Sequence, residues 1–361
     1  MKASAPADVV IVGAGVAGGL LALALRELGA TVTVVDAPPG NGLCTASELS
    51  YGALPGWPLA PTPLARLAAG ASKRWRLLQE RHGDLGWRPC RLRLHGAAAG
   101  WRPLSAFWPL PFAQVDSAVL AARLPLVLAA AGVTRLIAKV ESLDFQSASG
   151  WLLCLGDGTI FSADQLVLAA GAQCRQLWPL LPQRLRSSWA AALELASFPL
   201  QLGGPAAWLP VSFGRVGLER RAVGLCQPEW LVDGGLVPRA EGSLLGQHTL
   251  VNPGLELGLV PPSPEVERQL RQGLAAQAWG KPLAQLPGSL RQAAVAFCSE
   301  GLPLVGPLAD APGMWMFTGF SAGFSQVPVL APLLAQALAL EGAPAAAATR
   351  RLHKLGLGLP G

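Results

Sequence analysis

Charged side chains are scarce in this chain. They make up 14% of its 361 residues, while 51% of the residues are hydrophobic. An average soluble protein is about 25% charged, and a disordered chain combines high charge with few apolar residues. The composition therefore excludes a disordered protein and predicts one or two folded domains around a large apolar core.

The chain also lacks the spacing of a metal site. Its six cysteines form no CxxC pair, and they show no metal-ligand spacing with the four histidines. We therefore expect no metal. Scattered thiols without a disulfide framework are typical of a reduced, cytoplasmic protein.

One apolar run has to be weighed against a membrane span. Residues 9–25 carry no charge, but a span needs about 20 consecutive apolar residues, and this run is shorter and interrupted by glycines. Asp8 and Arg26 bound it, and no signal-peptide cleavage site is evident. We therefore expect no membrane insertion.

The net charge of +6 is concentrated in one segment. Between Arg66 and Arg93 the chain has eight basic residues against two acidic ones. Apolar residues recur there at helical spacing, which predicts a helix with a buried stripe and a solvated basic face. The alternative is a docking face for an acidic protein partner. We expect no nucleic-acid binding, because no recognition motif accompanies the charge.

The strongest signal is a nucleotide-binding motif near the start of the chain. A β-branched run at residues 8–12 precedes a GxGxxG motif, a helical pattern and a second apolar run that ends in an acid. The glycines permit a tight turn, a close approach to the pyrophosphate and close helix packing, and the acid accepts ribose hydrogen bonds. The helix N-terminus attracts the phosphates. We predict a dinucleotide site at Gly13, Gly15, Val16, Ala17, Gly18 and Asp36.

Later segments favour FAD over a nicotinamide cofactor. Asp157-Gly158 is typical of a hairpin turn, and residues 165–170 follow as a further buried strand, so the chain returns to the nucleotide fold. No second credible fingerprint for NADPH is present. We therefore expect a small organic substrate to be the reductant.

A series of short motifs supports this choice. In chain order they are ASELSYGAL (46–54), VD before a helix (115–116), ADQLVLAAGA (163–172), LVPR (236–239), GLPLVGP (301–307) and TGFSAGFS (318–325). The series resembles the FAD-dependent D-amino-acid-oxidase-like family, which includes glycine oxidase and sarcosine oxidase. The fingerprint is shared by many flavoproteins, whereas the order of the later motifs is more specific.

The resemblance implies FAD as the cofactor and adds residues to its site. It places the first motif beside the flavin, Val140 against the adenine and the backbone of the last motif near the flavin ring. We therefore expect further FAD contacts from Ala46, Ser47, Gly52, Val140, Ala170, Gly171, Gly319, Phe320, Ser321, Ala322, Gly323 and Phe324.

The substrate end departs from the family pattern. Members usually carry an arginine for the substrate carboxylate eight residues before the proline of GLPxxGP, and here that residue is Val295. Arg291 lies four positions away, or ~13 Å along a strand, so we expect no cation at this place. The expected substrate pocket comprises Tyr51, the only tyrosine, with Val295 and Arg239. Arg215 and Arg102 are further candidates for a cation from elsewhere.

Two further points follow from the same region. No side chain is assigned a catalytic role, because the cofactor itself can carry the chemistry. Cys298 lies in the general region where some sarcosine-oxidase-like members attach FAD covalently, but its register differs, and a buried free thiol is favoured.

The predicted fold is α/β: a Rossmann-like FAD-binding domain with a second, sheet-rich (α+β) substrate domain. The FAD-binding domain is expected to be discontinuous, at residues 1–82, 113–184 and 294–361. The substrate domain takes residues 83–112 and 185–293.

We therefore predict an FAD-dependent oxidoreductase. It would oxidise an amine or amino acid by hydride transfer to flavin, with dioxygen as acceptor. One alternative is a dehydrogenase of the same fold that acts on a non-amine and reduces a carrier. The other is a non-catalytic FAD-binding protein, which the departure at Val295 motivates.

Overall fold

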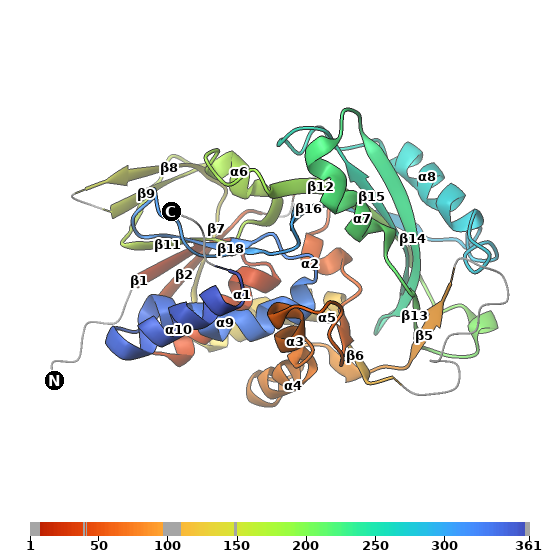
Figure 1. Ribbon diagram of the computed structural model, residues 1–361, viewed down its shortest axis with the longest axis horizontal. Helices are drawn as coiled ribbons and strands as arrows, with labels where there is room; N and C mark the ends of the chain where they lie inside the picture. The colour runs from red at the N-terminus through yellow and green to blue at the C-terminus, as the bar shows by residue number, and fades with distance from the viewer. Residues whose placement is uncertain (1–7, 39, 41, 97–109, 148–149, 358–361) are drawn as a thin grey trace.

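The computed structural model describes residues 8–38, 40, 42–96, 110–147 and 150–357. Two six-stranded sheets lie side by side in it (Figure 1). The first belongs to the nucleotide-binding part, and the second forms most of the substrate part. This is the predicted mixed α/β architecture.

The first sheet has the strand order β17-β18-β11-β1-β2-β7. All neighbouring strands are parallel except β17 and β18. The predicted order of strand, glycine-rich turn, helix α1 (Val16–Glu27) and second strand is confirmed. The strands are β1 (Asp8–Val12), β2 (Thr31–Asp36), β7 (Thr134–Ile137), β11 (Gln165–Leu168), β17 (Leu304–Pro307) and β18 (Met314–Thr318).

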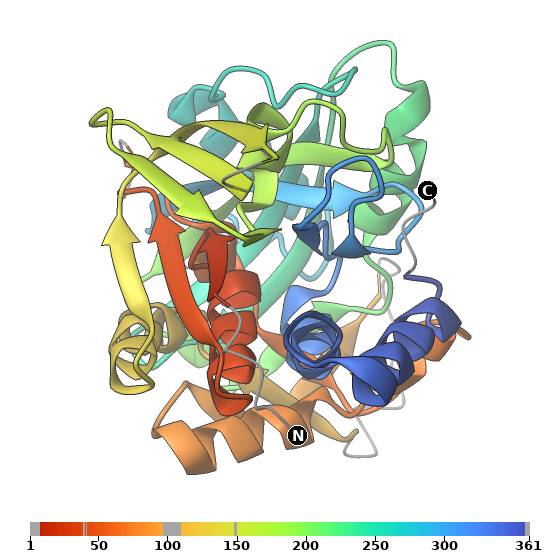
Figure 2. The ribbon, with the colours of Figure 1, turned by 90° about the vertical axis from the view of Figure 1, so that its left-hand side faces the viewer.

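Both faces of this sheet are covered (Figure 2). Helices α1, α9 (Gly323–Ala339) and α10 (Gly342–Lys354) lie on one face. On the other lies the three-stranded sheet of β8 (Val140–Gln146), β9 (Gly150–Leu155) and β10 (Ile160–Ala163). Val9 and Ile11 join the core under the helices, while Val10 and Val12 join the other core. A strand buried on both faces explains the unbroken apolar run.

The basic segment forms two helices, so the prediction of one helix is wrong. They are α3 (Pro63–Ala68) and α4 (Ala71–His82), separated at Ala69 and Gly70. Gly70 has φ −83° and ψ 2°, which leaves the helical region. Trp75 is fully buried, whereas the basic side chains Lys73, Arg74 and Arg76 of α4 are exposed.

The second sheet has the order β16-β12-β15-β14-β13-β5. Helix α8 (Ser263–Ala275) packs on one face, and α7 (Gly214–Arg221) stands beside β14. The strands are β5 (Leu92–His95), β12 (Leu185–Leu195), β13 (Ala207–Pro210), β14 (Glu229–Pro238), β15 (Ser243–Val251) and β16 (Ser289–Cys298).

Smaller elements join the two parts. β3 (Ala53–Pro55), β6 (Phe112–Val115) and β4 (Trp87–Pro89) form a three-stranded sheet. The remaining short helices are α2 (Ala46–Leu49) and α6 (Cys174–Leu177). Helix α5 (Ser117–Ala130) begins after Asp116, whose carboxylate caps it. No helix among the described residues is long and apolar enough to cross a bilayer.

The proposed domain boundary between residues 293 and 294 falls inside a strand. β16 pairs with β12 continuously from Ser289 to Cys298. Sheet pairing therefore extends the substrate part to Cys298, and residues 294–298 belong to its sheet. The rest of the proposed division stays a prediction.

One buried histidine makes the folded state sensitive to acid. The His95 ring stacks on Trp279 with ring centroids 4.2 Å apart, and its Nε2 lies 2.5 Å from the carbonyl oxygen of Gly234. Burial lowers the pKa of His95 from 6.5 to about 4. The unfolded chain therefore binds a proton below pH 6.5 that the folded chain binds only near pH 4, and stability falls as the pH drops through this window.

We expect His95→Phe to weaken this acid sensitivity. The phenyl ring keeps the stacking and removes the titrating group. Between pH 7 and 5 the wild-type chain should lose roughly 2 kcal/mol more of its free energy of unfolding than the variant does. Urea unfolding at both pH values measures this. His353→Phe, at an exposed position, should behave like wild type, and equal losses in all three proteins would contradict the assignment.

Candidate FAD and substrate site

A cavity of about 2150 Å³ is lined by residues of both parts. It exceeds the ordinary small-molecule pocket of about 300–1,000 Å³, so it has room for a dinucleotide and a substrate together. Most of the residues predicted from the sequence line its wall: Gly13, Gly15, Val16, Ala17, Asp36, Ala46, Ser47, Tyr51, Val140, Ala170, Gly171, Val295, Gly319, Phe320, Ser321, Ala322, Gly323 and Phe324.

The turn between β1 and α1 depends on two glycines. Gly13 has φ +104°, a conformation that side chains rarely adopt, and its N–H donates to Val35 O at 2.8 Å. A Cβ at Gly18 would lie 1.9 Å from Gly13 O. Gly18 therefore brings the helix against the turn, as the motif predicts, and does not itself line the cavity.

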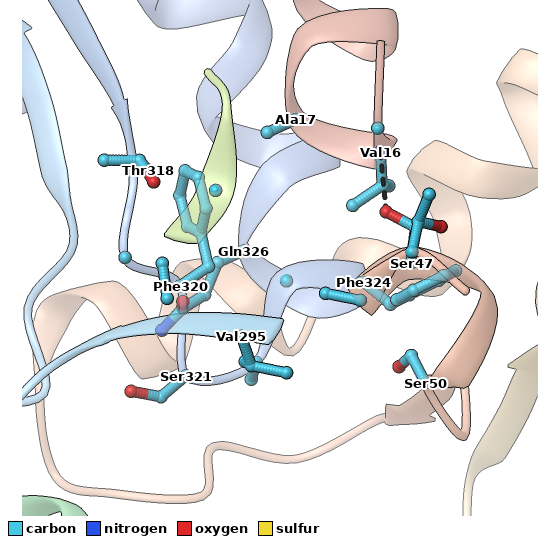
Figure 3. A pocket seen from close by; sticks show the side chains of 18 of the residues that line it. Val16, Ala17, Ser47, Ser50, Val295, Thr318, Phe320, Ser321, Phe324 and Gln326 are labelled. Carbon is cyan, nitrogen blue, oxygen red and sulfur yellow. Dashed lines mark hydrogen bonds between the residues drawn. The ribbon is translucent and has the colours of Figure 1, made fainter. Parts of the chain in front are cut away.

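The N-terminus of α1 is open to the cavity. Its N-cap residue, Gly15, offers no side chain, and no acidic residue lies in the first turn. The Val16 N–H donates to Ser47 Oγ at 3.0 Å, which fixes α2 beside the helix start (Figure 3). No acidic side chain in the first turn of α1 neutralises the positive end of the helix dipole, which therefore suits the pyrophosphate of FAD.

Asp36 lies at the end of β2 with one oxygen engaged. Its Oδ1 accepts from the Ala14 N–H at 2.9 Å. Burial raises the pKa of Asp36, while the Ala14 hydrogen bond and the charge of Arg135 act in the opposite direction. No described residue donates to Oδ2, so this oxygen can accept a ribose hydroxyl. The turn, helix end and acid thus fit the FAD nucleotide.

Hydrogen bonds from α4 and to β3 hold the loop after β18, at residues 319–325, in place. Trp75 of α4 donates its Nε1–H to Phe324 O at 2.7 Å, and the two rings stack at 5.8 Å. Ser325 Oγ donates to Ala53 O at 3.2 Å. Helical spacing indicates that Trp75 is buried but not what it contacts, because its partner is 249 positions away. The loop therefore faces the cavity with a fixed backbone.

Cys298 packs under the same loop. A Cβ at Gly319 would lie 2.6 Å from Cys298 Sγ. Burial raises the pKa of this thiol to about 12, so it is protonated at neutral pH and a poor nucleophile. This environment favours non-covalent FAD.

The substrate end carries an ion pair between Arg215, a candidate cation in the sequence, and Glu219, which no motif indicates. Arg215 of α7 donates from Nη1 to Glu219 Oε1 at 2.8 Å and from Nη2 to Ser321 O at 3.0 Å. Both side chains line the cavity. Val295 supplies no cation to the wall, and Arg215, one of the candidate cations from elsewhere, reaches it from α7.

The other candidate arginines lie elsewhere. Arg239 is absent from the wall, because its guanidinium pairs with Glu194 at 2.6 Å and also donates to Glu48 O and Ser117 Oγ. We no longer propose it as a substrate residue. Arg291 lies on the wall, half-exposed and 3.7 Å from Glu194. Arg102 lies outside the described residues.

Gly52 has a packing role rather than a place on the wall. Its φ is +61°, and a Cβ there would lie 1.8 Å from Val115 O. It therefore allows the segment after α2 to meet β6. This closeness positions the neighbouring Tyr51, which does line the cavity.

Comparison with known families agrees with this geometry. The family model described as FAD dependent oxidoreductase (DAO) matches residues 8–108 and 92–337. The chain therefore belongs to this family of FAD-dependent oxidoreductases. FAD is its cofactor, and we no longer propose a non-catalytic protein.

Solved structures share the fold over nearly the whole chain. Glycine oxidase from Geobacillus kaustophilus is 19% identical, with 93% of this chain and 95% of that chain covered and a TM-score of 0.68. Iminodiacetate oxidase from Chelativorans sp. BNC1 is also 19% identical, with coverages of 92% and 94% and a TM-score of 0.66. L-proline dehydrogenase from P. horikoshii is 14% identical, with 92% of each chain covered and a TM-score of 0.69.

We expect Asp36→Ala to weaken FAD binding without unfolding the chain. Hydrogen bonds to a charged acceptor contribute about 1.5–3 kcal/mol each, so the dissociation constant should rise at least tenfold. Titration of the apoprotein with FAD measures this. Asp310→Ala, which removes an exposed carboxylate, should leave the constant unchanged. Equal affinities for Asp36→Ala and wild type would show that another residue holds the ribose.

We expect Trp75→Phe to loosen the cavity loop. The ring and its stacking remain, but Phe324 O loses its buried donor, at a cost of about 1–3 kcal/mol. Urea unfolding and FAD titration should show lower stability and a severalfold weaker affinity. Trp87→Phe is the matched control, because Trp87 donates to Ser72 Oγ instead. An FAD affinity that stays at the wild-type value in Trp75→Phe would contradict the proposed anchor.

Proposed function

We propose that this enzyme oxidises the C–N bond of an amine or amino acid and passes the electrons to dioxygen. The observation that carries the proposal is the continuous cavity, which joins a nucleotide cradle at α1 to a largely apolar end beneath the second sheet. Glycine oxidase, iminodiacetate oxidase and L-proline dehydrogenase, which share the fold, are named for substrates with such a bond. These names support the substrate class.

The overall reaction balances as R₂CH–NHR′ + O₂ + H₂O → R₂C=O + R′NH₂ + H₂O₂. FAD, held by the turn at Gly13–Gly15, the N-terminus of α1 and Asp36, would supply the two-electron acceptor for oxidation of the carbon beside the nitrogen. The chain holds and orients the substrate and excludes water. Burial favours the neutral form of an amine, which is the form that can lose a hydride.

A second candidate function is that of a dehydrogenase, which passes electrons to a carrier instead of dioxygen. The exposed basic side chains of α4, Lys73, Arg74 and Arg76, would suit an acidic electron carrier. The enzyme would then be a dehydrogenase of the same fold that oxidises a non-amine substrate and reduces a carrier.

We propose the cytoplasm as the location of this protein, because all six cysteines are free thiols.

Anaerobic mixing tests the substrate class. We expect at least one member of a panel of amines and amino acids to bleach the visible flavin band within the mixing time course. A panel of hydroxy acids and alcohols at the same concentrations is the control. Bleaching by a control compound and by no amine would reject the amine class.

Peroxide yield then separates the two acceptors. An oxidase should give about one peroxide per substrate oxidised in air. Slow reoxidation in air, together with fast turnover on an artificial electron carrier, would favour the dehydrogenase.

A further inference from the structure

Helix α7 is held in place by Asp233 of β14. Its two carboxylate oxygens accept from the Gly214 and Arg215 N–H groups at 2.7 and 3.0 Å. Asp233 is buried and acts as the cap of α7. Both oxygens are therefore engaged by the chain itself, and the negative charge stays beside the cavity end.

Glu219 lies on α7 one turn after Arg215, and only one of its two carboxylate oxygens is engaged by Arg215. It is 3% exposed and lines the cavity, and its Oε1 accepts from Arg215. Within the described part of the chain, no group donates to Oε2. Burial raises the pKa of this carboxyl, while Arg215 acts in the opposite direction. This oxygen can therefore accept a hydrogen bond from a ligand in the cavity.

The charges at this end sum to a negative value. Arg215 balances one of the two carboxylates, Glu219 and Asp233, and leaves an excess of one negative charge. Arg220 also lines the cavity but is exposed, so solvent screens it. Arg291 is half-exposed and faces Glu194. The buried charge therefore favours a cation.

The hydroxyl of Tyr51 is the second unmet polar group. Tyr51 is 8% exposed and lines the cavity, and its hydroxyl has no hydrogen-bond partner among the described residues. Burial, followed by the nearby charge of Asp233, raises its pKa well above the ordinary value. It therefore remains a neutral phenol, and its buried oxygen adds no positive charge to balance the carboxylates.

The walls around these groups are apolar. They form one cluster with Tyr51 and belong to the substrate sheet and the segments beside it: Trp57, Leu92, Phe112, Leu209, Phe213 and Val295. Figure 3 shows Val295 in the same cavity as Phe320 and Ser321 of the loop. An aromatic or branched group would bury its surface here.

We propose that the substrate is an apolar amine without a carboxylate, whose ammonium binds Glu219 Oε2. The inference rests on the proposed function and narrows its substrate class. Oε2 can also take one proton from the ammonium, R–NH₃⁺ + –COO⁻ → R–NH₂ + –COOH. The neutral amine then stands in an apolar environment.

The alternative hypothesis is that Arg215 binds the carboxylate of an amino-acid substrate. Its Nε is buried without a partner among the described residues, so a donor is present. However, its charge is already neutralised by Glu219 at 2.8 Å, and Asp233 lies at the same helix end. A carboxylate bound there would face two like charges, which disfavours it.

A charge-matched pair of probes distinguishes the two. The FAD-loaded protein is titrated with benzylamine and with benzoate, followed by flavin absorbance and by calorimetry. We expect benzylamine to bind at least tenfold more tightly. Glu219→Gln should lose tenfold or more of the benzylamine affinity and gain affinity for benzoate, because Arg215 is then unpaired.

Glu229→Gln is the matched control, since Glu229 pairs with Arg221 outside the cavity. It should bind both probes like wild type. Tighter benzoate binding to wild type, removed by Arg215→Met, would overturn the proposal, as would binding of neither probe. The comparison on wild type needs no variant to fold. It is also independent of turnover, so failed amine oxidation and failed amine binding are separate results.

Discussion

The contact between α1 and the turn before it determines where the rest of the site can lie. Gly13 takes a left-handed conformation, and Gly18 lets the helix approach closer than any Cβ permits. The open end of α1 therefore stands at the edge of the parallel sheet. Asp36 and Ser47 engage N–H groups of the turn and helix start, and the remaining positive end is left for a phosphate.

The second sheet gives the other end of the same cavity a different character. The nucleotide end relies on backbone groups and a helix dipole, whereas the substrate end combines apolar walls with a buried ionic group. The loop at residues 318–324 lies between them. Trp75 holds it from α4, and Arg215 holds it from α7 through Ser321 O. A substitution of Trp75 or Arg215 should therefore change the affinity for FAD.

The sequence predicted what depends on neighbours in the chain. The glycine-rich turn and the flanking strands follow from local patterns, and the family resemblance supplied the start of α5 after Asp116 and most of the cavity wall. The break at Gly70 was missed, because the apolar spacing continues across it. Arg215 was one of several candidates, since its contact with Ser321 spans 106 positions. Arg239 was misplaced for the same reason: its partner Glu194 comes from another strand.

The crystal structure of the FAD-loaded protein with benzylamine tests the account most directly. We predict pyrophosphate contacts with the N–H groups of Gly15 and Ala17, ribose contacts with Asp36 and the flavin ring against residues 319–324. The ammonium should contact Glu219. A flavin ring outside this cavity, with Asp36 free of the ribose, would contradict the account.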